Sequence, residues 1–328
     1  MGKSHSKLKA ANVSLTNTAD SGSEIQIRRP SRIKLLNKNK YLYALIALPV
    51  VYYLVFHYAP MYGIIVSFKD YNIVKGIMGS PWAGFKWYEK FLTDPYFWKV
   101  VRNTFLLSLE NIIWGFPFPI IIALLLNEVR NRKFKKAIQS VTYLPHFIST
   151  VVVCGMLVSI LSSDGLVNNL IRALGGETKQ FLMYPEYFRT IYVVSEIWQK
   201  AGWTSIIYLA ALTGIDASIL DAATIDGANR MQRIRHVTLP AITPTISTLL
   251  IMDLGKMMNL GYEKVLLLYN GSTMETADII ATYVYRRGIL QNSFSYATAV
   301  GLFQTVIGVV LLVMANKVSK KLSETSLW

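Results

Sequence analysis

Long apolar segments alternate with short polar ones along most of this chain. Six segments carry at most two charged residues each and are about as long as the roughly 20 helical residues that cross a bilayer. They span residues 41–68, 103–127, 137–163, 190–215, 241–262 and 295–316. A buried amphipathic helix is the alternative for the fourth and fifth segments, which carry two charges each. The pattern predicts an all-α integral membrane protein with six transmembrane helices.

Composition supports this class. The 328 residues are 52% hydrophobic and 16% charged, whereas a soluble domain is about 25% charged. Residues 1–40 are polar and basic, which predicts a largely disordered arm followed by a membrane domain over 41–328. The apolar run after this arm is too long for a cleavable signal peptide. The lone Cys154 cannot form an intrachain disulfide.

Lysine and arginine residues are distributed unevenly between the two sets of loops. The two terminal segments and the loops 128–136 and 216–240 together carry 20, whereas the other three loops carry 12 over a slightly greater length. Cytoplasmic loops are enriched in Lys and Arg, so both termini are predicted to be cytoplasmic. The net charge of +15 largely reflects this asymmetry, and no compact domain exists to hold a nucleic-acid surface.

No catalytic motif accompanies the predicted helices. The chain has no Gly-x-x-x-x-Gly-Lys-Ser/Thr loop for nucleotide phosphates, no His-Glu-x-x-His zinc motif and no paired cysteines. Its four histidines are scattered along the chain, which makes a metal cluster improbable. We therefore expect neither an enzyme nor a bound metal.

Several polar and aromatic residues lie inside the predicted membrane segments, where polar groups are costly and often mark a transport pathway. The fourth and fifth segments contribute the candidates Glu196, Trp198, Lys200, Trp203, Tyr208, Asp253, Lys256 and Asn259. Aromatic faces stack on sugar rings, and amide or charged groups bind hydroxyls or a uronate carboxylate. The spacing of Glu196 to Lys200 and of Asp253 to Lys256 also suits simple salt bridges within a helix. The sequence is compatible with both a pathway lining and salt bridges within a helix.

The polar loop 216–240 has signals for two short helices. Asp216 can cap a first helix, and Gly227 can adopt a positive φ and end it in a sharp turn. Apolar and mostly small residues fall on one face of this helix, which allows close approach by a partner. Pro240 is predicted to end the second helix and start the fifth membrane segment. An ordinary capped hairpin between membrane helices is the alternative.

The same loop resembles a known motif. The coupling loop of binding-protein-dependent ABC importers has Glu-Ala-Ala, a Gly shortly afterwards, and an Ile or Leu with Pro about a dozen residues later. This chain matches it at Ala222, Ala223, Gly227, Val237, Leu239 and Pro240, with Asp221 in place of Glu. Residues 40–325 more widely resemble the polysaccharide-type, LplB-like permeases of carbohydrate ABC importers.

The resemblance implies the type I importer permease fold in a bacterial plasma membrane. It implies a second permease, two cytoplasmic ATPase subunits that use ATP and Mg, an extracellular sugar-binding lipoprotein and an oligosaccharide substrate. The implied coupling residues are Asp221, Ala222, Ala223, Asp226, Gly227, Ala228 and Pro240. The alternative is an ion-coupled secondary transporter with Asp253 and Glu196 as ion sites. That alternative predicts repeat symmetry or paired broken helices, and the sequence shows neither.

The topology can be tested by thiol labelling. A cysteine introduced at Ser218 should be shielded from impermeant reagents in intact cells, whereas one at Ser272 should be labelled, because the charge distribution places 216–240 in the cytoplasm. Labelling of Ser218→Cys from outside would overturn the orientation.

Overall fold

The structure is a computed structural model that describes residues 39–323. Nearly all of the predicted arm, 1–40, therefore lies outside the described residues. The chain divides into two units, one ending at Pro60 and the other beginning at Met61. In the first unit, α2 (Lys40–Tyr53) continues into a π-helical turn (Leu54–Tyr58) and the start of α3 (Ala59–Met61). None of the residues in these elements is buried, as expected for a helix surrounded by lipid or a partner protein.

The second unit is helical, and an isolated antiparallel bridge between Lys69 and Trp82 is the sole β pairing among the described residues. Its first half contains a 3₁₀ helix (Tyr62–Phe68), α4 (Gly76–Gly79), α5 (Lys86–Leu92), α6 (Phe97–Glu110), α7 (Pro117–Glu128), α8 (Arg132–Tyr143), α9 (Thr150–Leu161) and α10 (Leu166–Ala173). Its second half contains α11 (Pro185–Thr213), α12 (Ala217–Ile225), α13 (Arg230–Arg233), α14 (Leu239–Gly255), α15 (Tyr262–Leu268), α16 (Met274–Ala277), α17 (Ile280–Tyr285) and α18 (Phe294–Ser323).

Five continuous helical segments are long and apolar enough to cross a membrane. They cover Lys40–Phe68, Phe97–Glu128, Thr150–Ala173, Arg230–Gly255 and Phe294–Lys321. A sixth is reached when α11 and α12, which meet at a bend of 74°, are counted together. The all-helical, multi-pass fold class predicted from the sequence is therefore confirmed.

Two predicted segments have the wrong boundaries. The third, 137–163, is not one helix, because a 3₁₀ turn (Leu144–Phe147) separates α8 from α9. Pro145 cannot donate a backbone hydrogen bond, and the Ser149 side chain caps the new helix by accepting from the Val152 N–H. The fifth segment begins at Arg230 and ends at Gly255. Pro240 therefore does not end a separate second helix.

Three prolines are accommodated by π-helical turns rather than by breaks. Such turns cover Leu54–Tyr58, Asn111–Gly115 and Ile234–Thr238. Each of them ends two residues before a proline, at Pro60, Pro117 and Pro240 respectively. A proline lacks the N–H that an α-helix needs and clashes with the preceding turn. The wider π turn relieves that clash, so the long apolar helices continue through their prolines.

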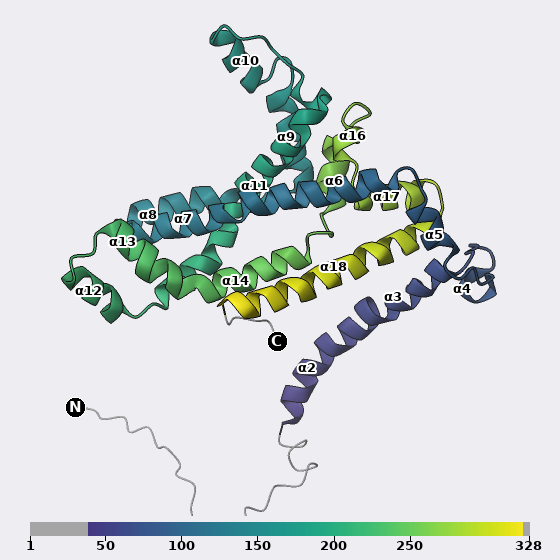
Figure 1. The fold of residues 1–328 in the computed structure, drawn as a ribbon, viewed down its shortest axis with the longest axis horizontal. Coiled ribbons are helices and arrows are strands. Elements are labelled where there is room, and N and C mark those ends of the chain that lie inside the picture. The colour runs from purple at the N-terminus through teal and green to yellow at the C-terminus, as the bar shows by residue number, and fades with distance from the viewer. Residues whose placement is uncertain (1–38, 324–328) are drawn as a thin grey trace, which may run out of the picture. The chain divides into compact units, whose positions relative to one another are not determined.

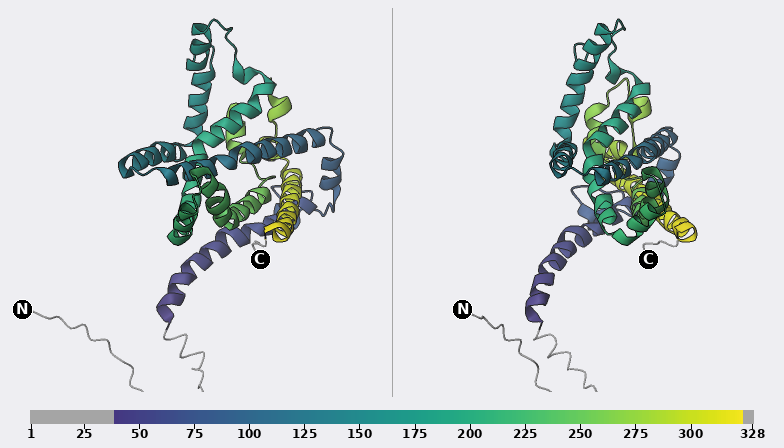
Figure 2. Two further views of the ribbon diagram at one scale, coloured as in Figure 1. Left: turned by 60° about the vertical axis from the view of Figure 1, so that its left-hand side comes forward. Right: turned by 90° about the vertical axis from the view of Figure 1, so that its left-hand side faces the viewer.

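Two pairs of long helices organise the second unit. α7 packs along α11, and α14 packs along α18, as Figures 1 and 2 show. α8 also approaches α11 closely, at Gly202. A Cβ at that position would lie 2.0 Å from the Thr142 carbonyl oxygen, so a larger residue there would force the two helices apart.

The fifth membrane segment stops inside the helical bundle. α14 ends at Gly255 and α15 begins at Tyr262, and the backbone between them is mostly not helical. The Met257 carbonyl accepts a hydrogen bond from Ser108 on α6, and the Met258 carbonyl accepts one from Gln304 on α18. Irregular backbone at membrane depth persists only where protein or a wet cavity satisfies it. These two side chains therefore hold an unwound segment in place.

A polar cluster around Asp94 joins the loop before α6 to α17 and α18. The Asp94 carboxylate accepts from the Tyr283 hydroxyl at 2.7 Å, the Tyr296 hydroxyl at 3.1 Å and the Tyr96 backbone N–H at 2.8 Å. Burial alone would raise the pKa of Asp94, but these hydrogen bonds and the Arg287 charge outweigh burial and hold the pKa below its ordinary range. The ionised carboxylate is thus the form that the fold stabilises.

We expect Asp94→Asn to lower the thermal stability of the detergent-solubilised protein, since losing a hydrogen bond to a charged acceptor costs on the order of 1–3 kcal/mol. A carboxylate whose pKa is lower in the folded state stabilises the fold at pH values above its unfolded pKa. It loses this contribution as the pH falls through its folded pKa. The deficit of the variant should therefore be complete at neutral pH and shrink in strong acid. Asp70→Asn, which breaks an exposed pair with Lys86, is the matched control and should change the melting temperature little. Equal melting temperatures for wild type and Asp94→Asn at neutral pH would contradict the assignment.

Candidate functional site: a polar cavity and an exposed helical loop

A cavity of about 370 Å³ lies inside the second unit. Its walls come from α6 and the π turn that follows, the start of α7, one face of α11, the end of α14 and the unwound segment 256–261. The polar side chains at its surface are those of Ser108, Asn111, Tyr192, Glu196, Lys200, Thr204, Tyr208, Asp253, Lys256 and Asn259. Ligand pockets typically have a few hundred cubic ångströms and a small number of placed polar groups, and this cavity fits that description.

Six of the eight residues predicted to line a pathway lie at this cavity. They are Glu196, Lys200, Tyr208, Asp253, Lys256 and Asn259. The fourth and fifth membrane segments, which the sequence singled out for their polar residues, form two of its walls. Asn111 and Tyr192 also line it. Tyr192, like Ser108 and Thr204, was not predicted from the sequence, although it lies one turn before Glu196.

Trp198 and Trp203 do not line the cavity. Trp198 is two residues from both Glu196 and Lys200, so it lies on the opposite side of the helix. The Trp203 ring is stacked on His146, with the ring centroids 4.7 Å apart and an interplanar angle of 1°. The 3₁₀ turn at Leu144–Phe147 brings His146 there, and no pattern within the fourth segment indicates that contact.

Glu196 is the centre of a buried ionic cluster. One carboxylate oxygen lies 2.5 Å from the Lys200 ammonium, and the other lies 2.9 Å from the Lys264 ammonium. Lys264 also donates to the Gln199 amide oxygen at 3.3 Å, and the Gln199 amide donates to the Ile148 carbonyl. Lys200 keeps 60% of its side chain exposed, whereas Lys264 keeps 4%. The predicted Glu196–Lys200 salt bridge and the predicted cavity position therefore occur together.

Lys264 was not among the residues predicted from the sequence. It belongs to the short helix α15, which follows the unwound segment and looked like part of a loop. A lysine directly before the apolar run 265–268 is a weak signal, because a solvated loop would explain it equally well. Its ion-pair partner, Glu196, is 68 residues away in the chain, so no local pattern reveals the pair.

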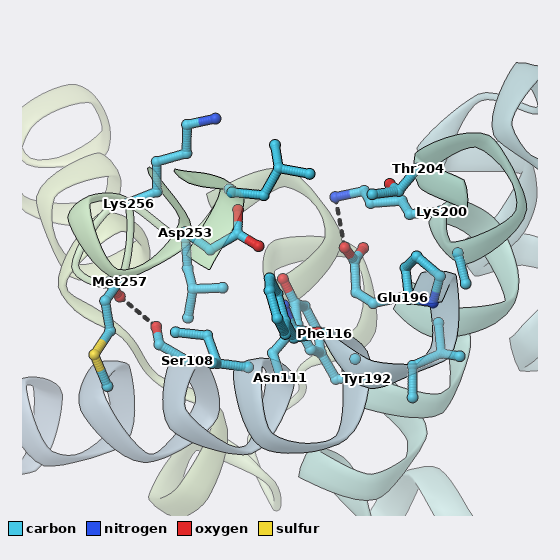
Figure 3. Close-up of a pocket in the computed structure, with 18 of the residues that line it drawn as sticks. Ser108, Asn111, Phe116, Tyr192, Glu196, Lys200, Thr204, Asp253, Lys256 and Met257 are labelled. Atoms are coloured by element: carbon cyan, nitrogen blue, oxygen red, sulfur yellow. Dashed lines mark hydrogen bonds and ion pairs between the residues drawn. The ribbon is translucent and has the colours of Figure 1, made fainter. Parts of the chain in front are cut away.

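Asp253 and Lys256 occupy the opposite wall of the cavity. Figure 3 shows Asp253 on α14 extending toward the Glu196–Lys200 pair, whereas the Lys256 side chain rises past Asp253 without a marked interaction with that pair. Among the residues that the structure describes, no ion pair joins Asp253 to Lys256. The cavity thus presents one closed salt bridge, Glu196–Lys200, and the charges of Asp253 and Lys256, which do not pair with each other. Within the same described residues, no three His, Cys, Asp or Glu side chains gather as a metal site would require.

The loop between α11 and α14 carries the second candidate site. Asp216 caps α12 by accepting from the Ser218 N–H, which holds the Asp216 pKa below its ordinary range. Gly227 has φ +76° and ends the helix in the predicted sharp turn. Asn229 and Gln232 then form a reciprocal capping box at the start of α13. These caps fix two helices at an angle, as Figure 1 shows.

The surface of this loop is open. Asp221, Ala222, Asp226, Gly227 and Pro240 are exposed, and Ala223 and Ala228 are half-buried. Large apolar side chains also face outward, with Ile225 86% exposed and Met231 70% exposed. Arg230 pairs with Glu128 at the end of α7 at 2.9 Å, which anchors the loop to the bundle. The arrangement is a fixed, partly apolar projection.

Comparison with known proteins identifies the family. Residues 115–324 match the binding-protein-dependent transport system inner membrane component family, and the chain belongs to that family. It is therefore a multi-pass membrane protein of the ABC importer permease class.

Similar proteins cover almost the whole chain. The polygalacturonan/rhamnogalacturonan transport system permease protein YteP of Bacillus subtilis is 44% identical over 302 residues, which are 92% of this chain and 94% of YteP. Protein LplB of the same organism is 43% identical over 294 residues, 89% of this chain and 92% of LplB.

A solved structure shows the same fold. A chain in the crystal structure of a bacterial ABC transporter that imports the acidic polysaccharide alginate has a TM-score of 0.82 and 40% identity to this chain. The match covers 89% of this chain and 99% of that one. The same transporter in complex with an alginate pentasaccharide-bound periplasmic protein matches with a TM-score of 0.83 and 39% identity.

Proposed function

We propose that this protein is a membrane-spanning subunit of an ATP-driven importer of oligosaccharides or polysaccharide fragments. The observation that carries the proposal is a polar cavity inside a permease-family fold, walled by the two helical segments on either side of an exposed helical loop. A solute in the cavity contacts α11 and α14, and a partner on the loop pushes on those same elements. YteP is named for the transport of polygalacturonan and rhamnogalacturonan, and the transporter of similar structure imports alginate. Relatives of lower identity are named for lactose and for arabinooligosaccharides.

The cavity suits a sugar chemically. Hydroxyl, amide, carboxylate and ammonium groups occur together at its surface, and sugar hydroxyls both donate and accept hydrogen bonds. Tyr192 and Tyr208 add aromatic rings, and aromatic faces are apolar surfaces on which a sugar ring can stack. A cavity of about 370 Å³ in one chain holds part of an oligosaccharide. A second permease of similar fold would supply the rest of the pathway.

The loop of α12 and α13 is proposed as the site that couples transport to ATP hydrolysis. The residues concerned are Asp221, Ala222, Ala223, Asp226, Gly227, Ala228 and Pro240. A cytoplasmic ATPase subunit with bound ATP and Mg would receive the projection, and an extracellular binding protein would deliver the sugar. Closure of two ATPase subunits would draw the loops of the two permeases together. Since the loop connects α11 to α14, that movement would open and close the cavity on alternate sides.

The ion-coupled alternative assigns Asp253 and Glu196 as ion or proton sites. Glu196 is already bound by two ammonium groups, which leaves it poorly placed to take up and release a cation. The relatives that match most of the chain are permeases of binding-protein-dependent systems. The ATP-driven function is therefore the one we propose.

The proposal is tested by reconstitution in liposomes with the partner permease, the ATPase and the sugar-loaded binding protein. We expect uptake of a short uronate oligosaccharide to require ATP and Mg on the side of the membrane where the ATPase is bound. Uptake should be unaffected when sodium and proton gradients are collapsed. Uptake driven by an ion gradient without ATP would support the alternative instead.

Gly227→Val tests the coupling role. A Cβ at this position meets no atom within 4 Å, so the cost comes from the positive φ, on the order of 1–3 kcal/mol. We expect ATP-driven uptake to fall severely while membrane insertion is unchanged. Gly271→Val is the matched control, because Gly271 also has open space around it but no positive φ. Normal uptake by Gly227→Val, together with normal binding to the ATPase, would show that this turn does not couple the two subunits.

A further inference from the structure

Lys264 lies behind the cavity wall and adds to the positive charge around the cavity. Five charged side chains stand at the cavity or directly behind it, namely Lys200, Lys256, Lys264, Glu196 and Asp253. Four of them line the cavity, and Lys264 does not. Three cations against two anions leave one positive charge in surplus. Without Lys264, the surplus would vanish.

The contacts of Lys264 hold its ammonium in place. Its nitrogen is 2.9 Å from a Glu196 oxygen, 3.3 Å from the Gln199 amide oxygen and 5.6 Å from the centre of the Tyr192 ring. An ammonium has three donors and no acceptor; Glu196 and Gln199 accept from two of them, the Tyr192 ring lies within cation–π range, and only 4% of the Lys264 side chain is exposed. Lys264 is therefore held by protein groups and buried, and it does not meet a solute in the cavity.

Lys200, unlike Lys264, is exposed to the cavity. Both ammonium groups bind the same carboxylate, one at each oxygen, but most of the Lys200 side chain remains exposed at the cavity. One carboxylate carries one negative charge, and Lys264 neutralises that charge from the buried side. Two ammonium groups therefore share one negative charge, and one positive charge is left uncompensated; Lys200, which still pairs with Glu196 at 2.5 Å, is the exposed one of the two.

We propose that Lys264 is a specificity-determining positioning residue, which makes the cavity selective for anionic oligosaccharides by sharing the charge of Glu196, so that Lys200 keeps a net attraction for a sugar carboxylate. This inference rests on the proposed function and deepens it. Charge-assisted hydrogen bonds between an ammonium and a carboxylate are about twice as strong as neutral ones. In the partly desolvated cavity, a charge pair gains further strength over one in water. The carboxylate of Asp253 on the facing wall repels a sugar carboxylate. The sugar carboxylate therefore approaches Lys200 rather than that wall.

The test compares two sugars with the same backbone, one charged and one neutral: a short oligogalacturonide and its fully methyl-esterified form. Uptake of each is measured with the reconstituted transporter, using binding protein loaded with the respective sugar, and the ratio of acidic to neutral uptake is compared between variants. Lys264→Met should lower this ratio about tenfold, since a lost charge-assisted contact is worth at least that factor. Glu196→Gln should raise the ratio, because it removes an anion.

The double variant Glu196→Gln/Lys264→Met is the matched control, since it restores the net charge of the cavity and should bring the ratio back toward wild type. It also keeps the test valid if Lys264→Met alone, which leaves Lys200 as the remaining ammonium partner of Glu196, assembles poorly. An equal decrease for both sugars in Lys264→Met, or an unchanged ratio in Glu196→Gln, would show that Lys264 has a purely structural role. If the wild type transports neither sugar with ATP, the proposed function fails and this inference fails with it. If the wild type transports both and the ratios do not move, the inference alone fails.

Discussion

The constraint on which this structure depends is that hydrocarbon offers no hydrogen-bond partners, so each polar group at membrane depth must be satisfied by the protein or by a wet cavity. The fold meets this constraint first with long helices, which satisfy their own backbone. It meets it again at the prolines, where π turns keep the helices continuous. Where a helix does stop, at Gly255, side chains from α6 and α18 bind the exposed carbonyls.

The same constraint explains the ionic cluster. A carboxylate buried without a partner would be strongly destabilising, and Glu196 has two ammonium partners and lies next to a cavity. Such clusters are costly to place inside a membrane and mark functional regions. The unwound segment 256–261, the end of α14 and the polar face of α11 all meet at this point. The cavity thus forms where the fold is least regular.

The exposed loop and the cavity are parts of one mechanical unit. α12 and α13 are tied to the bundle by the Arg230–Glu128 pair and by the direct continuation of α13 into α14. The π turn at Ile234–Thr238 keeps that continuation helical. A displacement of the loop would therefore pass along a continuous helix to Asp253 rather than into a non-helical linker. This continuity, which the sequence did not reveal, gives the proposed coupling a physical route.

The sequence by itself determined the class of the protein, because membrane helices and their lengths follow from apolar runs that a single segment contains. It also determined the capped turn at Asp216 and Gly227, whose signals are local, and six of the cavity residues, because polar groups in apolar segments are conspicuous. Only the tertiary structure decided that Trp203 stacks on His146 and that Lys264 neutralises Glu196. Each of these depends on contacts between distant parts of the chain, and neither periodicity nor composition within one segment carries information about such contacts.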